Sequence, residues 1–249
     1  MERISELERH KTVTHSGINA TPRNMRLYYL SKRVIDVIVS IIALILLSPL
    51  MLIIAALIRL DSPGPVIFTQ KRVGSVRRKR NGRLCWKQTE FSFYKFRTMV
   101  DRADNSIHRA FIKALIKNDE QKIRSLLNSD TQIKKLVNDP RITRLGHILR
   151  RSSLDELPQF WNVLRGEMSL IGPRPAIPYE VEMYKPWYFR RFEAKPGLTG
   201  LWQIVARSSA DFDEMVRLDI EYVDNQSFWL DLKIMLMTPV VILLHRGAA

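Results

Sequence analysis

The sequence predicts an α/β fold, mostly α-helical, arranged as a monotopic membrane protein: a re-entrant helix-break-helix element followed by a small domain with amphipathic interfacial helices. Three observations support this prediction. Residues 34–58 form an apolar block in which Asp36 is the one charged residue. Basic residues lie on both sides of the block, and Ser48 and Pro49 lie near its middle. The 249 residues are enough for one membrane element and one globular domain of ordinary size.

A straight helix over residues 34–58 would be about 37 Å long, which is enough to cross a bilayer. The positive-inside rule, however, places both basic flanks on the cytoplasmic face. Pro49 removes one backbone hydrogen bond and kinks the helix, and Ser48 can reduce that loss by bonding to a carbonyl one turn earlier. We therefore expect the helix to bend at Ser48-Pro49 and return to the same face. A spanning helix with a tolerated proline is the alternative. The flanking basic residues are Lys32 and Arg33 before the block, and Arg59, Lys71 and Arg72 after it.

The formal net charge of +15 is unevenly distributed. Residues 71–87 contain eight basic residues and no acidic one. Such a run can be a solvated loop, a nucleic-acid patch or a contact with anionic lipid headgroups. Its position just after the membrane element favours the lipid contact, where each basic residue contributes about 1 kcal/mol. The single cysteine, Cys85, excludes an internal disulfide and suits the reducing cytoplasm.

The chain divides into three expected parts. Residues 1–24 are polar and unpatterned, and we expect a mobile N-terminal tail without a signal-peptide cleavage site. Residues 25–60 form the re-entrant membrane element, with Tyr28 and Tyr29 at the membrane interface. Residues 61–249 form the cytoplasmic domain, which starts with a turn-rich segment at 61–65.

Four segments of the 61–249 domain have a predictable secondary structure. Residues 66–70 and 91–96 are expected to be short strands, the second alternating aromatic and polar side chains. Residues 101–137 have a helical period. Residues 228–244 are too short and too charged for a confident membrane span, and they fit an interfacial helix with Trp229 at the headgroups.

The residues with the clearest chemical potential lie between 139 and 175. Ser153 and Glu156 have capping-box spacing, and Pro158 is tolerated in a first helical turn, so a helix should start at about 154–157. Asp155 and Glu156 would then lie at a helix N-terminus, beside unpaired N–H groups and the positive end of the helix dipole. This environment keeps a carboxylate ionised and also attracts phosphate.

Arginines surround this acidic pair in the sequence, and guanidinium groups bind phosphate oxygens through two parallel hydrogen bonds. Gly172-Pro173-Arg174-Pro175 is expected to be a stiff loop that fixes the approach of Arg174. Taken singly, both features have ordinary explanations, because capping boxes and Gly-Pro turns are common without catalysis. The arginines are Arg141, Arg144, Arg150, Arg151 and Arg174.

Taken together, these segments resemble the bacterial sugar transferases of the small monotopic phosphoglycosyl transferase kind, exopolysaccharide type. The resemblance runs from about residue 30 to the C-terminus, and that family also carries a membrane hairpin with a Ser-Pro break. The matching segments are KRVIDVIVS, SPGPVIFTQKRVG, FYKFRTM, DPRITRLG, SLDELPQFWNVLRGEMSLIGPRP, KPGLTGLWQI and YVDNQSFWLDLKIM.

The resemblance implies catalysis at the cytoplasmic face of the bacterial inner membrane. It implies transfer of a hexose 1-phosphate from a UDP-sugar to undecaprenyl phosphate, with release of UMP. Asp155 would be the nucleophile that forms a covalent intermediate. Glu156 would hold Mg²⁺ together with Asp155 and assist proton transfer. A carboxylate nucleophile suits transfer between two bulky partners because it divides the reaction into two steps.

The remaining candidates are basic. Arg150 and Arg174 are expected to bind the diphosphate, with Arg141 close by. Lys95 and Arg97 would bind phosphate or hold the carboxylates in place. Lys195 would close the site or form part of a turn.

Three other functions remain open. A membrane-attached nucleic-acid binder would use the basic run, but the resemblance predicts no nucleic-acid partner. A scaffold without catalysis would not need the acidic pair. A glycosyl transferase would release UDP instead of UMP. The sequence gives neither the sugar nor the oligomeric state, although the 101–137 segment could pack against a second subunit of a homo-oligomer.

Overall fold

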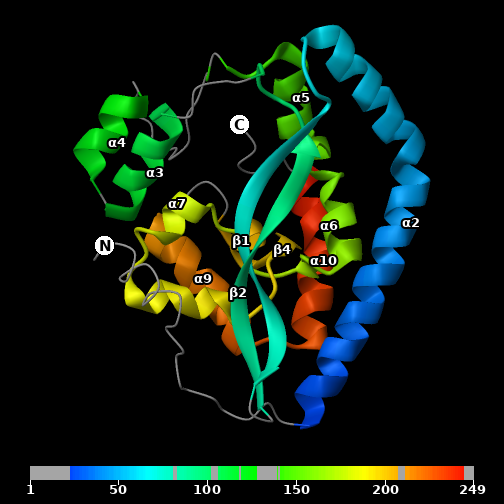
Figure 1. Ribbon diagram of the computed structural model, residues 1–249, viewed down its shortest axis with the longest axis vertical. Coiled ribbons are helices and arrows are strands. Elements are labelled where there is room, and N and C mark those ends of the chain that lie inside the picture. The colour runs from blue at the N-terminus through cyan, green and yellow to red at the C-terminus, as the bar shows by residue number, and fades with distance from the viewer. Residues whose placement is uncertain are drawn as a thin grey trace.

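The protein is described here by a computed structural model, in which a long helix lies along one side of a mixed helical and β body (Figure 1). The expected N-terminal tail and part of the 101–137 segment fall outside the described residues. The described residues are 23–80, 83–101, 106–117, 119–127, 139, 141–206 and 211–243.

The membrane element is one continuous helix, α2 (Arg23–Asp61), with Pro49 inside it. The Ser48 hydroxyl donates to the Ile45 carbonyl at 2.8 Å, as expected from the sequence. Figure 1 shows α2 as an arc, not as two helices with a break between them. The predicted helix-break-helix is therefore wrong in one respect: Pro49 is accommodated in a curved helix without interrupting it, because the Ser48 hydroxyl occupies the carbonyl that Pro49 cannot reach.

Both halves of α2 are attached to the same body of protein. In the first half, Asp36 is buried and accepts hydrogen bonds from the Leu170 amide at 2.9 Å and the Ser169 hydroxyl at 3.1 Å. In the second half, Ile54 and Ile58 are buried in a cluster on the other end of the domain. This cluster also contains Phe96 and Leu149.

The middle of α2 is apolar and uncovered. Among the described helices, α2 is the one long and apolar enough to cross a membrane, and only 11% of its most apolar stretch is buried. A core helix of a water-soluble domain would be mostly buried, so this exposure indicates an apolar surrounding for α2. The exposed side chains include Ile41, Ile42, Ile45, Leu46, Leu52 and Ile53.

A long antiparallel hairpin follows α2 and is formed by β1 (Ile67–Arg80) and β2 (Arg83–Phe96), paired from Ile67↔Phe96 to Arg80↔Arg83. The strands predicted at 66–70 and 91–96 are only the base of this hairpin. Residues 71–80 and 83–87 of the basic run are therefore β structure, and Arg72 among them is buried.

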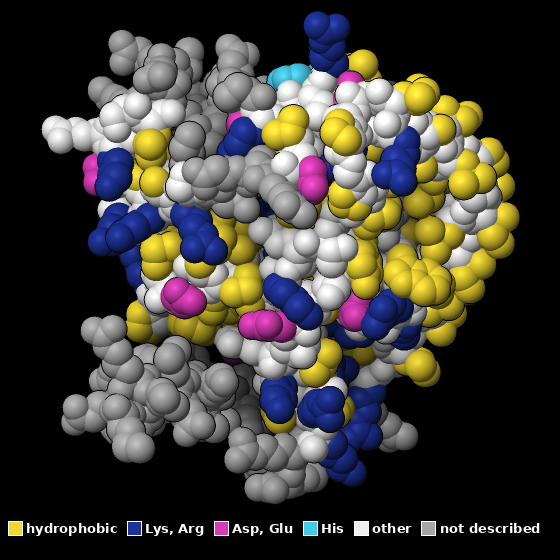
Figure 2. Space-filling view, turned by 45° about the horizontal axis from the view of Figure 1, so that its top comes forward, with side chains coloured by type: hydrophobic (Ala, Val, Ile, Leu, Met, Phe, Trp, Pro, Cys, Tyr) yellow, Lys and Arg dark blue, Asp and Glu magenta, His cyan; other side chains and the backbone are white. Residues whose placement is uncertain are grey.

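Near the hairpin tip, the Arg77 guanidinium lies 3.8 Å from the centroid of the Tyr29 ring at the start of α2. Lys and Arg side chains gather at the end of the molecule where these two elements meet (Figure 2). Arg26, Arg78, Lys79 and Lys87 are exposed. Contact of this end with lipid headgroups stays a prediction.

The predicted 101–137 helical segment contains two short helices, α3 (Ser106–Lys117) and α4 (Glu120–Leu127). Phe111 and Ile123 are buried in a core cluster that also contains Phe212 of α9. The helical period is confirmed for these residues. Figure 1 shows both helices on the side of the molecule away from α2.

The centre of the domain is a two-stranded parallel sheet, β3 (Ser169–Ile171) beside β4 (Gly197–Thr199). Gly172 directly follows β3, and a Cβ atom there would lie 2.2 Å from the Lys195 carbonyl, so only glycine fits this approach. The surrounding helices are α5 (Arg144–Ser152), α6 (Gln159–Arg165), α7 (Pro178–Val181), α8 (Leu201–Val205), α9 (Phe212–Asp224) and α10 (Phe228–Leu243), with 3₁₀ turns η1 (Leu154–Glu156) and η2 (Pro186–Phe192).

The last helix, α10, has one buried and one exposed side. Asp231 is buried and accepts hydrogen bonds from Lys32 at 2.7 Å, Tyr222 at 2.8 Å and Tyr28 at 2.9 Å. Of the two charges that counted against a membrane span, Asp231 therefore faces the protein, whereas Lys233 is exposed. Trp229, 75% exposed, lies on the uncovered side with Leu236 and Val240.

Candidate active site

The acidic pair lies in a sharp connection between two helices. Helix α5 ends at Ser152, and Ser153 has a left-handed backbone with φ 57° whose N–H bonds to the carbonyls of Leu149 and Arg150. The turn η1 follows, and α6 begins only at Gln159. Ser153 thus ends α5, and among the described residues its side chain caps no helix. The predicted capping box is wrong, because the Ser153 backbone is already used to terminate the preceding helix.

Asp155 is buried at the centre of this connection, with 6% of its surface exposed. The Lys95 ammonium at the end of β2 lies 3.9 Å from an Asp155 carboxylate oxygen. Burial raises the pKa of Asp155, and the positive charges of Lys95 and Arg150 oppose that rise. Burial also lowers the pKa of Lys95, which the Asp155 carboxylate opposes. Both cations favour the ionised carboxylate, but burial outweighs them, so the pKa of Asp155 stays above its ordinary value.

Arg150 in the last turn of α5 is held by its surroundings. Its Nε donates to the Thr98 hydroxyl at 2.9 Å, and burial lowers its pKa while Asp155 and Asp139 raise it. Arg141 forms a two-pronged ion pair with Asp139, with Nη2 to Oδ2 at 2.6 Å and Nε to Oδ1 at 2.8 Å. The structure thus brings Arg150 to Asp155 and places Arg141 in the next layer around it.

Arg174 is linked electrostatically to the surroundings of Asp155 through a buried neighbour, Arg72. Arg72 Nη1 donates to the Pro175 carbonyl at 3.0 Å. Burial and the charge of Arg174 lower the pKa of Arg72, and burial together with Arg150 and Arg72 lowers the pKa of Lys95. Asp155 is therefore followed by a series of cations that leads from Lys95 through Arg72 to Arg174. Such an arrangement favours a ligand that carries several negative charges in a row.

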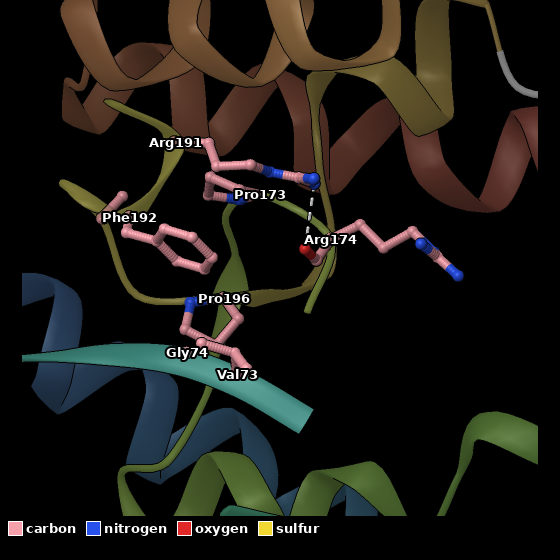
Figure 3. Close-up of a pocket in the computed structure, with 8 residues that line it drawn as sticks. Val73, Gly74, Pro173, Arg174, Arg191, Phe192 and Pro196 are labelled. Carbon is pink, nitrogen blue, oxygen red and sulfur yellow. Dashed lines mark hydrogen bonds between the residues drawn. The ribbon is translucent and has the colours of Figure 1, made fainter. Parts of the chain in front are cut away.

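The GPRP loop that carries Arg174 is firmly packed. Figure 3 shows the Arg174 side chain extending away from Pro173 and Pro196, while Arg191 donates to the Arg174 carbonyl at 3.1 Å. The cavity in this view is about 10 Å³, which is room for no more than a water molecule. The loop therefore positions Arg174 and is not itself a ligand pocket.

Arg174 also approaches Glu180, with Nη1 3.5 Å from its carboxylate. Glu180 is fully buried and accepts from the Ile177 amide at 3.0 Å. Burial alone raises the pKa of Glu180, but Arg174, Arg72 and the Ile177 amide together hold it below its usual value. Arg174 keeps 28% of its side chain exposed, so it can still reach a ligand.

Two predicted residues have other surroundings. Arg97 donates to the carbonyls of Ser62 at 2.6 Å and Pro63 at 2.8 Å, which fixes the turn after α2. These contacts favour a structural role for Arg97 over the predicted phosphate or carboxylate contact. Lys195 lies beside Gly166. Burial and Arg33 lower its pKa and Asp36 raises it, so its charged neighbours belong to α2 and not to the surroundings of Asp155.

A cavity of about 240 Å³ opens beside Glu156. It lies between η1, α6, β4, α8 and the last turns of α10, and its walls are largely apolar. Glu156 and Ser153 form its end nearest to Asp155. The sequence predicts neither this groove nor the buried position of Arg72. The apolar residues of the groove come from four separate elements and from Leu157, and Arg72 is one of several arginines in a basic run.

Asp155 and Glu156 are also the candidate ligands for a metal ion. Within the described part of the chain, no group of three or more His, Cys, Asp or Glu residues lies at ligand spacing. Mg²⁺ is commonly held by one or two carboxylates together with substrate phosphates, so the Asp155 and Glu156 pair fits this type of site. A closed metal cage made by protein groups alone does not fit these residues.

A buried carboxylate flanked by cations, next to an exposed apolar helix, is the kind of site expected of a membrane-associated enzyme with anionic substrates. Comparison with known proteins gives the family. The model of the bacterial sugar transferase family matches residues 27–245, and the chain belongs to that family.

Three relatives show how the chain compares with whole proteins. The galactosyl transferase CpsE of Streptococcus agalactiae serotype III is 39% identical over 256 residues, covering 99% of this chain and 49% of that protein. The undecaprenyl-phosphate galactose phosphotransferase of Salmonella typhimurium is 41% identical over 217 residues, covering 87% of this chain and 41% of that protein. The exopolysaccharide production protein ExoY of Rhizobium meliloti is 37% identical over 224 residues, covering 88% of each. The chain thus spans about half the length of the first two.

Proposed function

We propose that this protein transfers a hexose 1-phosphate from a UDP-sugar to undecaprenyl phosphate as an early membrane step of polysaccharide synthesis. The observation that carries the proposal is the buried Asp155 carboxylate between Lys95 and Arg150. The names of the relatives from Salmonella typhimurium and Rhizobium meliloti support the acceptor and the pathway class.

In the first step, an Asp155 carboxylate oxygen attacks the phosphorus that carries the sugar. The bond between that phosphorus and the bridging oxygen breaks, and UMP leaves with the bonding electrons. Arg150, Lys95 and Arg174 bind and orient the diphosphate, so that charge is neutralised where it develops. In the second step, an oxygen of undecaprenyl phosphate attacks the same phosphorus and releases Asp155.

Glu156 has two proposed roles. It accepts a proton from the acceptor phosphate when that phosphate is protonated, and together with Asp155 it contributes to a Mg²⁺ site. When bound, Mg²⁺ would neutralise charge on the donor diphosphate. Both roles require Glu156 to face the substrates, which agrees with its position at the end of the groove.

The placement of the site follows from α2. We propose that this helix enters one leaflet from the cytoplasmic side of the inner membrane and returns to it. Attachment of both halves of α2 to one domain supports this topology, since a straight spanning helix would separate them. The active site would then lie at headgroup depth, where a lipid phosphate and a soluble nucleotide sugar can meet.

Nucleotide release tests the proposed reaction. The full chain in detergent or nanodiscs is incubated with Mg²⁺, undecaprenyl phosphate and each of several UDP-sugars, and the nucleotide product is separated. We expect UMP with one sugar. Release of UDP would instead identify a glycosyl transferase, the activity that the name of the Streptococcus agalactiae relative suggests. Absence of any nucleotide with all donors would contradict both.

Replacing Lys95 by methionine is expected to move the acid limb of the pH–activity profile to higher pH. Lys95 holds down the pKa of Asp155, so its removal raises that pKa and protonates the nucleophile earlier as the pH falls. At pH values above this limb, we expect kcat/KM to fall roughly fivefold, since a partly exposed ion pair contributes about 1 kcal/mol.

The control is Lys95→Arg, which keeps the positive charge and should leave the acid limb in place. The measurement is kcat/KM for nucleotide release against pH in both variants. An acid limb at the same pH in the wild type and Lys95→Met would show that Lys95 does not control the ionisation of Asp155.

A further inference from the structure

The groove beside Glu156 has one charged end and apolar walls. Its apolar lining comes from α6, β4, α8, α10 and the residue after η1, and includes Leu157, Phe160, Leu198, Ile204, Val241 and Ile242. The hydroxyl groups of Thr199 and Thr238 also line it and bond to each other at 3.0 Å, and Thr238 bonds to the Ile234 carbonyl at 2.7 Å. These hydroxyls are thus engaged within the protein. The lining also contains the Gln203 amide, whose nitrogen donates to the Leu198 carbonyl at 3.4 Å, so this wall is mostly but not wholly apolar.

We propose that this groove binds the isoprene units of the lipid phosphate acceptor that lie next to its phosphate. This inference rests on the proposed function for the identity of the acceptor, and it assigns a place to the acceptor's chain. The ligand class follows from the order of groups along the site. Lys95 and Arg150 lie around Asp155, Glu156 borders the groove, and the apolar walls lie beyond it.

Only one of the two substrates has this order of groups. A polyprenyl phosphate has an anionic head joined directly to a hydrocarbon chain. A nucleotide sugar has polar groups on both sides of its diphosphate, and these would lose their hydrogen bonds with water against apolar walls. The groove therefore suits the acceptor chain better than the sugar or the nucleoside.

The size of the groove limits how much of the chain it can hold. An apolar cavity of about 150 Å³ holds a benzene-sized molecule. The groove, at about 240 Å³, therefore holds a few isoprene carbons and not a whole undecaprenyl chain. The rest of the chain must therefore lie outside the groove, in the surrounding bilayer.

Two adjacent valines in α10 provide a matched test. Val241 lines the groove, whereas Val240 is 53% exposed and is not part of its lining. Direct binding of undecaprenyl phosphate to detergent-solubilised full-length protein is measured for the wild type, Val241→Trp and Val240→Trp. We expect Val241→Trp to weaken binding at least about tenfold, since losing the burial of two methylene groups corresponds to that ratio. Val240→Trp should bind like the wild type.

A smaller pair, Val241→Asn and Val240→Asn, covers the case in which tryptophan disturbs folding, and the thermal unfolding midpoint is recorded for every variant. Equal affinities within each pair, or no binding of undecaprenyl phosphate by the wild type, would overturn the groove assignment. UMP release from the donor without acceptor is measured in parallel. If the wild type releases no UMP from the donor in this assay while the Val241 substitutions weaken acceptor binding, the proposed reaction is rejected and the groove assignment stands.

Discussion

Asp155→Asn is expected to abolish sugar-phosphate transfer, with kcat reduced by at least about a thousandfold, as is usual when a covalent nucleophile is removed. Asparagine has nearly the same shape but lacks the anionic oxygen that attacks phosphorus. The measurement is UMP release and formation of labelled protein from a donor that carries radioactive sugar phosphate. The wild type should retain label on the protein when the acceptor is left out, and the variant should not.

The substitution must be separated from loss of folding. Asp155 is buried beside Lys95, so asparagine leaves that lysine without its counter-charge and can lower stability. Binding of UDP-sugar without turnover serves as the control, because Arg150 and Arg174 remain in place. Retained donor binding with lost labelling would support the nucleophile. Label on Asp155→Asn at the wild-type level would remove Asp155 from that role.

Much of this site could be predicted because its chemistry is local in sequence. Asp155, Glu156 and Arg150 lie within seven residues, and the structure does bring Arg150 close to Asp155. Lys95 is more than fifty residues away in the sequence. Its ammonium nevertheless lies near the Asp155 carboxylate, which is one of the two contacts predicted for it. The wrong capping box shows the limit. A serine followed by a glutamate three residues later has that spacing whether or not its backbone is left-handed, and only the preceding helix decides this.

The β-hairpin could not be predicted at its full length for a different reason. Strands are recognised by alternation of apolar and polar residues, and the 71–87 run replaces that alternation with basic residues. Arg72 occupies an inward position, where it lies 5.0 Å from the Phe93 ring centroid and donates to the Pro175 carbonyl. The sequence does not distinguish an arginine that points inward from one that points outward. The series of cations from Lys95 through Arg72 to Arg174 is therefore recognised only in the three-dimensional structure.

The double substitution Ser48→Ala and Pro49→Leu is expected to straighten α2 and to change its topology. Pro49 has no N–H for the Ile45 carbonyl, and the Ser48 hydroxyl donates to that carbonyl instead, at 2.8 Å. Leucine at 49 supplies the missing N–H, so the regular helical hydrogen bond to Ile45 returns and the reason for the bend disappears. A straight helix of 39 residues cannot keep both ends docked on the same domain.

The topology is measured by cysteine labelling from each side of the membrane, in a background where Cys85 is replaced by serine. The exposed Arg26 and Asp61, at opposite ends of α2, are each replaced by cysteine. With the native Ser48-Pro49, we expect both cysteines to react from the cytoplasmic side. In the double variant, one end should become reactive only from the other side. Leu52→Ala with Ile53→Leu, on the exposed surface of the same helix, is the matched control and should keep both ends cytoplasmic.

Straightening must break one of the two attachments of α2 to the domain. The free-energy cost of each break and the length of the connecting chain indicate which attachment is lost. Undocking the first half would remove the bonds of Asp36 to Ser169 and Leu170. It would also remove the bonds of Asp231 to Lys32 and Tyr28, while Tyr222 would still donate to Asp231. Removing the partner of a buried charge typically costs about 3–5 kcal/mol. Undocking the second half exposes Ile54 and Ile58, at about 1.5–3 kcal/mol each, and frees the Arg97 contacts. In a bilayer those two isoleucines would be covered by lipid, so the second half is released at lower cost. The connection to β1 opposes this release, however, because the six residue steps from Asp61 to Ile67 reach at most about 22 Å, less than the hydrocarbon core of roughly 30 Å. The Asp61 end therefore stays with the domain, and we expect the Arg26 end to cross the membrane. Nucleotide release should fall with it, because the bonds of Asp36 to Ser169 and Leu170, which join α2 to the centre of the domain, are then lost. Two cytoplasmic ends in the double variant would show that docking alone, without the proline, holds α2 in one leaflet.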